Sequence, residues 1–113
     1  MKILNFGSCN IDYVYDVDHI VQPGETLVAD GLSKFPGGKG LNQSIAIAKA
    51  GAEVYFAGCI GTDDTMLRPI LKQAGVDISN LLAVEEPTGQ AIIQVDKHGE
   101  NSIVIYRGAN GAV

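Results

Sequence analysis

The sequence predicts an α/β protein, and three observations support this prediction. Short apolar runs near 2–8 and 53–60 are typical of buried strands in a parallel sheet. Stretches with the i, i+3, i+4 apolar spacing of helices occur between and after them. Two further segments, at about 12–35 and 88–107, contain half-polar strand patterns that are typical of antiparallel hairpins. Together these patterns predict a parallel βαβαβ unit that carries two hairpins.

The composition limits the kinds of partner. The chain has 113 residues, of which 46% are hydrophobic, and this is enough for one domain with a core. A net charge of −5, with no tryptophan, argues against a nucleic-acid or anionic-membrane surface. No apolar run approaches the ~20 residues that span a bilayer, and Met1-Lys2 with a short strand is not a signal peptide. We expect a cytoplasmic protein without nucleic-acid or membrane partners.

Polar residues follow the first predicted strand directly. The run 2–8 is short and does not alternate, which predicts a buried central strand. Asn10 and Asp12 come just beyond its carboxyl end. Because ligands in open α/β sheets bind outside the carboxyl ends of strands, both are candidate ligand-binding residues. For Asp12, a simple turn role remains an alternative.

The segment after Asp12 predicts the first hairpin. Residues 13–17 and 26–35 alternate between apolar and polar side chains. Gln22-Pro23-Gly24-Glu25 lies between them and predicts a turn, because proline presets φ and glycine supplies positive φ.

A glycine-rich stretch, Pro36 to Gln43, precedes the best helical pattern in the chain, 41–50. Glycine favours positions where the backbone takes positive φ or lies against another group. A helix N-terminus after such a turn, with Lys39 beside it, is the layout of a site for an anion or a polar ligand. Gly51 then predicts the end of the helix.

This stretch does not match the familiar nucleotide loops. In a Walker A motif Gly40 would have to be Ser or Thr, and Ser33 would have to be glycine. In a dinucleotide fingerprint starting at Gly38, Gln43 would have to be the third glycine. A loop that only makes a sharp turn, with Lys39 as a solvated lysine, remains an alternative.

The remaining elements follow in order. A second buried strand over 53–60 precedes Asp63-Asp64, which we interpret as a helix cap rather than a metal site. The apolar stripe of 66–74 predicts a second helix that starts late, because Pro69 lies inside it. A short strand is expected within 76–84, and a hairpin follows it.

Two cysteines and two histidines are expected to have no catalytic or metal-binding role. Cys9 and Cys59 are expected to be buried free thiols. His19 and His98 are expected on the surface, and the chain has no pattern typical of a metal site.

The order and spacing of the motifs resemble ribokinase and its relatives, the pfkB-type carbohydrate kinases. A lone Gly-Gly-Lys-Gly is a weak signal, whereas an ordered set over essentially the whole chain is specific. The matching segments are 7–12, 23–26, 37–43, 51–52, 61–63, 75–77, 88–89 and 108–110. Thr65-Met66 departs from the family, which often has an aromatic-Gly pair there.

The resemblance implies a ribokinase-like doubly wound parallel sheet, here partial, with a small β lid made by the hairpins at about 12–35 and 88–107. It implies a lid hinge at Gly37 and Gly38 and a homodimer formed through the lid. It also implies that a sugar is bound by Asn10, Asp12, Gly38, Lys39 and Asn42 and covered by Ala91 and Ile93.

The implied reaction is ATP-dependent phosphoryl transfer to a sugar hydroxyl, with ribose giving ribose 5-phosphate; another sugar or a nucleoside is the alternative substrate. The family's catalytic base lies in a Gly-Ala-Gly-Asp loop that this chain lacks. ATP, Mg²⁺ and a monovalent cation would bind mainly to the missing half. We therefore expect residues 1–113 to be the N-terminal portion of one truncated domain, without catalytic, cofactor or metal residues. Alone it would be inactive, and would act only as a sugar-binding or lid-dimerisation module.

Overall fold

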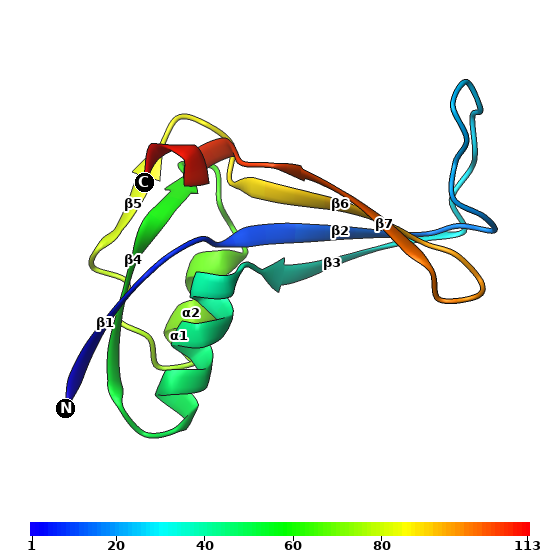
Figure 1. The fold of residues 1–113 in the computed structure, drawn as a ribbon. Coiled ribbons are helices and arrows are strands. Elements are labelled where there is room, and N and C mark those ends of the chain that lie inside the picture. Colours follow the sequence, from blue (N-terminus) through cyan, green and yellow to red (C-terminus); the bar gives the residue numbers. More distant parts are fainter.

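The computed structural model describes residues 1–113 and contains two sheets, of which the second extends from the body as an arm (Figure 1). The inner sheet has the strand order β1-β4-β5, and the outer sheet has the order β3-β2-β6-β7. The strands are β1 (Lys2–Phe6), β2 (Asn10–Asp16), β3 (Gly31–Gly37), β4 (Glu53–Gly61), β5 (Leu81–Val84), β6 (Gly89–Val95) and β7 (Asn101–Tyr106). The helices are α1 (Lys39–Lys49), α2 (Leu67–Gln73) and a short 3-10 helix, η1 (Gly108–Ala112).

The inner sheet confirms the predicted parallel βαβαβ unit. β1 pairs in parallel with β4, and β4 pairs in parallel with β5. Helices α1 and α2 form the two connections. The expectation that the first strand is central and buried is wrong for this chain: β4 is central, and β1 lies at an edge with alternating exposure.

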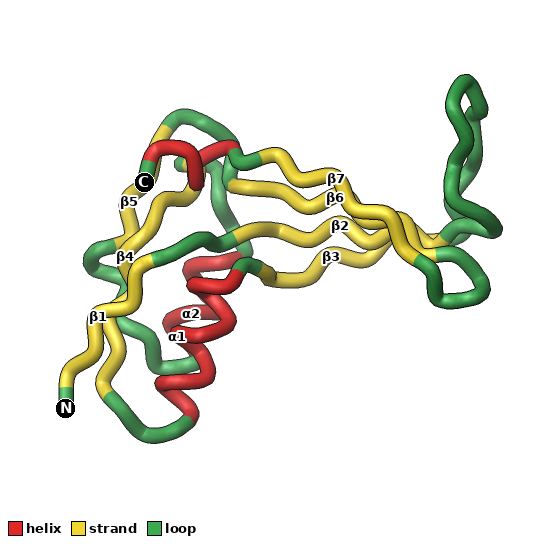
Figure 2. Tube along the Cα trace, viewed as in Figure 1, coloured by secondary structure: helices red, strands yellow, loops and turns green.

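The core lies between the inner sheet and the two helices, which cover the same face (Figures 1 and 2). Alternate side chains of β4 point into this layer, as the two-residue period of a strand requires. The buried cluster consists of Cys9, Leu41, Val54, Phe56, Ile60, Leu67, Leu71, Val76 and Leu81. The opposite face of the inner sheet is open, with Leu4 and Phe6 each 66% exposed.

The outer sheet joins the two hairpins edge to edge. β2 pairs antiparallel with β3, and β6 pairs antiparallel with β7. β2 and β6 then pair in parallel, from Asn10 opposite Gly89 to Asp16 opposite Val95. The sequence did not predict this third pairing, because the two strands lie far apart along the chain.

The bounds of the first hairpin and helix differ from the predictions. The turn at Gln22–Glu25 is present: Gly24 has φ 79, and the Glu25 N–H donates to the Gln22 carbonyl at 3.0 Å. Residues 26–30 form a loop, and β3 begins only at Gly31. Helix α1 begins at Lys39, two residues before the predicted start, so the glycine-rich stretch lies partly inside its first turn.

Helix α2 starts late, as predicted. It begins at Leu67, so Pro69 lies in the first turn, where its missing N–H costs no helical bond. The Asp64 carboxylate accepts the backbone N–H groups of Met66, Leu67 and Arg68 at 3.2, 2.9 and 3.1 Å. The interpretation of this acidic pair as a helix cap is therefore confirmed for Asp64.

The loop between β1 and β2 packs directly on the backbone at the start of α1. The Leu41 N–H donates to the Ser8 carbonyl at 3.1 Å. A methyl group on Gly40 would lie 2.7 Å from the Gly7 carbonyl carbon, and one on Gly38 would lie 2.7 Å from Cys9 Cα. Gly38 also has φ 98, which side chains other than glycine rarely adopt. Both positions therefore require glycine.

Both cysteines are buried free thiols, as expected. Cys9 Sγ donates to the Cys59 carbonyl at 3.6 Å. Burial raises the pKa of the Cys9 thiol to about 12, which makes it a poor nucleophile. None of the helices has the length and apolar character needed to cross a membrane.

His19 lies in the loop at the tip of the arm, between two carboxylates. Its Nδ1 is 3.1 Å from Asp18 Oδ2, and its Nε2 is 2.8 Å from Glu25 Oε2. The hydrogen bonds to Asp18 and then Glu25 raise the pKa of His19 above 6.5. The pKa of Asp18 is lowered by His19 and Lys97, and that of Glu25 by the Gln22 N–H and by His19. This tip is therefore held by exposed, charge-assisted hydrogen bonds.

The tip contacts are expected to be firmest between about pH 4.5 and 6.5. The contribution of His19 is complete below 6.5 and is lost as the pH rises through its raised folded-state pKa. The contribution of Glu25 is present above 4.5 and is lost as the pH falls through its lowered pKa. An NMR titration should give His19 a midpoint above 6.5, and Glu25→Gln should lower it. A His19 midpoint at or below 6.5 that Glu25→Gln leaves unchanged would contradict this account.

Gly38→Ala is expected to lower the free energy of unfolding by about 2–5 kcal/mol. A left-handed residue costs roughly 1–2 kcal/mol, and overpacking against Cys9 costs about 1–3 kcal/mol. Urea unfolding measures the change. Gly111→Ala is the matched control, because a methyl group there has no atom within 4 Å, so its effect should stay within about 0.5 kcal/mol. Similar effects of the two substitutions would show that the backbone contact is not tight.

Candidate functional site

The predicted site residues meet where the outer sheet joins the body. Asn10 is the first residue of β2 and lies opposite Gly37, the last residue of β3. On its other side it lies opposite Gly89, the first residue of β6. A methyl group on Gly89 would lie 2.8 Å from Asn10 Oδ1. The absence of a side chain on Gly89 therefore makes room for the Asn10 amide.

Asp12 lies on the same face of the outer sheet as Asn10, because the two are separated by one strand period. A methyl group on Gly37 would lie 2.5 Å from each Asp12 carboxylate oxygen. The carboxylate therefore fits only because Gly37 has no side chain. Partial burial raises the pKa of Asp12 above 3.8, since it removes water from the charged form.

Lys39 and Asn42 lie in the first turn of α1, beside this junction. Both side chains are exposed, and Lys39 takes part in no ion pair. The backbone N–H groups of the turn are partly used: Leu41 donates to Ser8, and Asn42 donates to the Gly38 carbonyl at 3.0 Å. Two of the N–H groups at the start of α1 are thus bonded within the chain and are not available to a phosphate.

The two-residue spacing of Ala91 and Ile93 predicts that they share one face of their strand, and the register with β2 makes it the face of Asp12. Ala91 lies opposite Asp12 in the β2–β6 register and is 6% exposed. Ile93 lies opposite Val14, one strand period further along the arm. The structure therefore brings Ala91 next to the polar pair and leaves Ile93 farther out.

Two apolar residues near the polar pair were missed by the sequence reasoning. Phe35 lies opposite Asp12 on β3, and Ile105 lies opposite Ala91 on β7. The apolar run of 101–107 is visible in the sequence, but the register that places Ile105 here follows only from strand pairing. A hollow of about 370 Å³ opens beside it, lined by Ser8, Asn10, Ile105, Arg107, Asn110, Gly111 and Val113.

Asn110 is a third residue that the sequence reasoning did not assign to the site. It lies in η1, 100 residues after Asn10. Its Nδ2 donates to Asn10 Oδ1 at 2.7 Å and to the Cys9 carbonyl at 3.0 Å. Its Oδ1 accepts the Cys9 N–H at 3.1 Å. The motif Gly108-Ala109-Asn110 is one of the segments that resemble the kinase family. Its position in the sequence does not indicate that Asn110 contacts Cys9 and Asn10.

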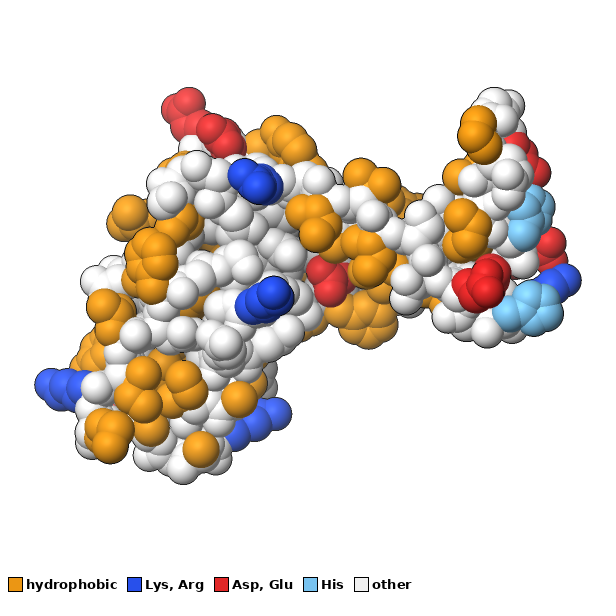
Figure 3. All heavy atoms as spheres, in the orientation of Figure 1, with side chains coloured by type: hydrophobic (Ala, Val, Ile, Leu, Met, Phe, Trp, Pro, Cys, Tyr) orange, Lys and Arg blue, Asp and Glu red, His pale blue; other side chains and the backbone are white.

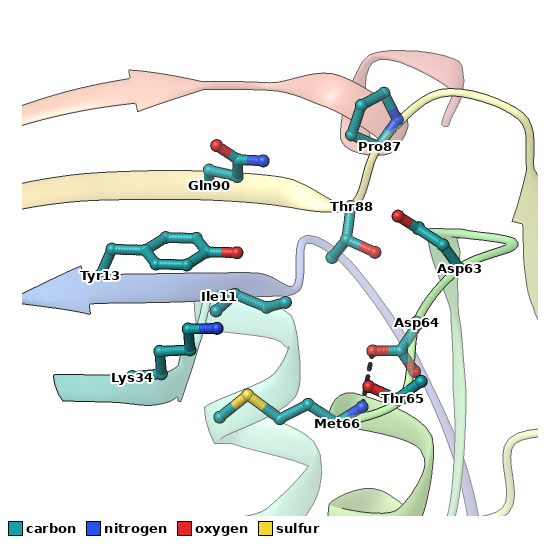
Figure 4. A pocket seen from close by; sticks show the side chains of 10 residues that line it. All are labelled: Ile11, Tyr13, Lys34, Asp63, Asp64, Thr65, Met66, Pro87, Thr88 and Gln90. Atoms are coloured by element: carbon teal, nitrogen blue, oxygen red, sulfur yellow. Dashed lines mark hydrogen bonds between the residues drawn. The ribbon is translucent and has the colours of Figure 1, made fainter. Parts of the chain in front are cut away.

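A second pocket, of about 280 Å³, lies on the opposite face of the outer sheet (Figure 4). Tyr13, Lys34 and Gln90 line it from the sheet, opposite the segment Asp63–Met66. Lys34 Nζ lies 5.4 Å from the centre of the Tyr13 ring, a cation–π contact. None of the predicted sugar-site residues lines this pocket.

The same arrangement occurs in solved structures. The ribokinase from Cryptococcus neoformans var. grubii serotype A, in complex with ADP, has a TM-score of 0.89 and 47% identity, over 96% of this chain and 35% of that one. The Arabidopsis thaliana ribokinase complexed with ribose and ATP has a TM-score of 0.86 and 33% identity, over 96% of this chain and 36% of that one. The chain thus has the ribokinase fold, in the part that these proteins share with it.

Sequence comparison identifies the family. The whole chain, residues 1–113, matches the pfkB family carbohydrate kinases. It is 44% identical over 107 residues to the ribokinase of Haemophilus influenzae, covering 92% of this chain and 35% of that protein. The chain belongs to the pfkB carbohydrate kinase family and spans about a third of the length of the curated relatives it matches.

The raised pKa of Asp12 predicts how its replacement affects stability. Above its folded-state pKa the carboxylate is ionised at a partly desolvated position, which opposes folding, and this cost disappears as the pH falls through that pKa. Asp12→Asn should therefore leave stability unchanged or raised at pH 7, and this gain should shrink toward pH 4. Urea unfolding at both pH values measures it. Asp16→Asn, at an exposed carboxylate on the same face of β2, is the control. A loss of stability in Asp12→Asn at pH 7 would contradict the prediction.

Proposed function

We propose that this chain is the sugar-holding part of an ATP-dependent carbohydrate kinase and that the sugar is ribose, which is converted to ribose 5-phosphate. The observation that carries the proposal is the placement of Asn10 and Asp12 together against Gly37 in a member of a carbohydrate kinase family. The likeness to ribokinases, one of them complexed with ribose, supports ribose as the substrate. Another sugar or a nucleoside is the alternative, since a carboxylate and an amide recognise hydroxyl groups in general.

The proposed sugar site combines polar and apolar contacts. The Asp12 carboxylate accepts hydrogen bonds from hydroxyl groups, and Asn10 and Asn42 contribute amides. Lys39 supplies a positive charge beside them, and Gly38 contacts the sugar through its backbone. Ala91, Ile93 and the neighbouring Ile105 cover the carbon side of the ring.

The outer sheet is the proposed lid over this site. Gly37 and Gly38 connect β3 with α1, so a change in their backbone angles would swing the sheet relative to the body. Lid closure would exclude water, which otherwise competes with the sugar as phosphoryl acceptor.

ATP, Mg²⁺ and a monovalent cation are assigned to the part of the kinase that this chain does not contain. No segment here has a nucleotide-binding loop, and two N–H groups at the start of α1 are bonded within the chain. No group of three or more His, Cys, Asp or Glu side chains is placed to hold a metal ion. The residues present thus do not fit the nucleotide or the metal, and the catalytic base is assigned to the same missing part. The role of this chain is to position the acceptor hydroxyl for in-line transfer.

A homodimer through the lid is the proposed assembly. The outer sheet exposes large apolar side chains, which lie along the arm in Figure 3. They include Leu32 and Phe35 on β3 and the run Ile103–Tyr106 on β7, each more than half exposed. By the strand register, Phe35, Ile103 and Ile105 share the face of Asp12, and the other three lie on the opposite face. Exposed apolar side chains gathered on one face are typical of an association surface.

A second candidate follows from the length of the chain. It spans 35% of the Haemophilus influenzae ribokinase and holds no nucleotide loop. By itself it would act as a sugar-binding or lid-dimerisation module without kinase activity.

The test is to replace the matching N-terminal part of the Haemophilus influenzae ribokinase with residues 1–113 and to assay ADP formation with a panel of sugars. Ribose-dependent turnover that falls at least about 100-fold in Asp12→Ala supports the proposal. Asp16→Ala is the matched control and should keep its turnover. A folded chimaera that phosphorylates another sugar but not ribose would identify a different substrate.

The 113-residue chain alone tests the assignment of ATP to the rest of the kinase. We expect calorimetry to show weak ribose binding, and a coupled assay to show no ADP formation. Ribose-dependent ADP formation by the isolated chain would contradict the assignment of ATP to the missing part.

A further inference from the structure

The contacts of Asn110 determine which way round its own amide lies. Its Oδ1 is 3.1 Å from the Cys9 N–H, which can only donate. Its Nδ2 is 3.0 Å from the Cys9 carbonyl oxygen, which can only accept. Turning the amide around would place Asn110 Nδ2 against the Cys9 N–H, two donors, and Asn110 Oδ1 against the Cys9 carbonyl oxygen, two acceptors. The orientation of Asn110 is therefore fixed by the backbone of Cys9.

This fixed amide in turn orients Asn10. Asn110 Nδ2 is also 2.7 Å from the side chain of Asn10, so the atom of Asn10 that faces it must be an acceptor, Oδ1. The two hydrogens of Asn110 Nδ2 are thus used by the Cys9 carbonyl and by Asn10 Oδ1. Asn10 Nδ2 donates no hydrogen bond within the chain, and Asn10 is one of the residues that line the hollow beside Ile105. Asn10 therefore presents a donor to a ligand.

We infer that Asn110 is a positioning residue for substrate recognition, because it holds Asn10 as a hydrogen-bond donor beside the acceptor Asp12. This inference rests on the proposed sugar site. A donor and an acceptor on one face select a ligand with an accepting oxygen next to a donating hydroxyl. A vicinal pair of hydroxyl groups provides both, because one can donate to Asp12 while its neighbour accepts from Asn10.

Two glycines support this arrangement. A methyl group on Gly89 would lie 2.2 Å from Asn110 Nδ2 and 2.8 Å from Asn10 Oδ1. Gly108, at φ 50, turns the chain from β7 into η1, and the next N–H, of Ala109, donates to the Pro87 carbonyl at 2.7 Å. The start of β6 and the end of β7 thus bring Asn110 to the first residue of β2.

A double-mutant cycle with ribose tests the positioning role in the 113-residue chain. Dissociation constants are measured by NMR titration for the wild type, Asn10→Ala, Asn110→Ala and the double variant. We expect each single variant to weaken binding about five- to tenfold, the equivalent of one lost hydrogen bond, and the double variant to bind no more weakly than Asn10→Ala. Asn80→Ala, at an exposed asparagine, is the control and should bind as the wild type. If Asn110→Ala weakens binding equally with and without Asn10, its role is only structural and the inference is overturned.

The free chain gives a readout that does not depend on ribose. Hydrogen exchange of the side-chain NH₂ groups should be slow for Asn110 and fast for Asn10. Fast exchange at Asn110 with slow exchange at Asn10 would show the reverse orientation and overturn the inference. If ribose does not bind but the exchange pattern is as expected, the orientation of Asn10 stands and ribose as the ligand of this chain fails.

Asn110→Asp is the second variant, because it keeps the acceptor for the Cys9 N–H while it loses both bonds that Asn110 Nδ2 donates. A carboxylate cannot donate to Asn10, so we expect the Asn10 amide to turn around and donate to it. Exchange at the Asn10 NH₂ should then slow, and ribose binding should weaken about five- to tenfold. Unchanged exchange at Asn10 in this variant would overturn the inference.

Discussion

The structure depends on one contact between two stretches of backbone. The loop Gly7–Cys9 lies directly on Gly38–Gly40, with the Leu41 N–H bonded to the Ser8 carbonyl. Four elements start or end at this contact: β1, β2, β3 and α1. Any side chain at Gly38 or Gly40 would separate them, so the relative placement of the inner sheet, the outer sheet and the candidate site follows from the absence of two Cβ atoms.

Local patterns in the sequence predicted most of the fold. The apolar runs, the Gly51 cap, the Asp64 cap and the hairpin turn each depend on neighbours within a few residues, and each is present. The edge position of β1 and the parallel pairing of β2 with β6 were not predicted, because they depend on which distant strands meet. The loop over residues 26–30 was mistaken for strand, since alternation alone does not supply a pairing partner.

In the candidate site too, some residues could be predicted from local patterns, and others depend on contacts between distant parts of the chain. Asn10 and Asp12 could be singled out from their place after a strand, and Ala91 and Ile93 from their spacing within the family resemblance. Asn110 could not, because its importance comes from three hydrogen bonds to residues about a hundred positions earlier. The glycine-rich stretch first suggested an anion cradle, but its N–H groups are partly bonded within the chain. Its glycines instead make room for the Ser8 loop and for the Asp12 carboxylate.

The parallel pairing of β2 with β6 also has a consequence for the order of folding. The first two strands of the arm can form a hairpin early in synthesis, but β6 pairs with β2 at a separation of 79 residues, as from Asn10 to Gly89. Closing so long a loop has a large entropic cost, and contacts of this separation form slowly. On the ribosome, the bond from Asn110 can form only when nearly the whole of this chain has emerged. The ligand-facing end of the arm should therefore be among the last parts of this chain to become ordered, after the helices have packed on β4.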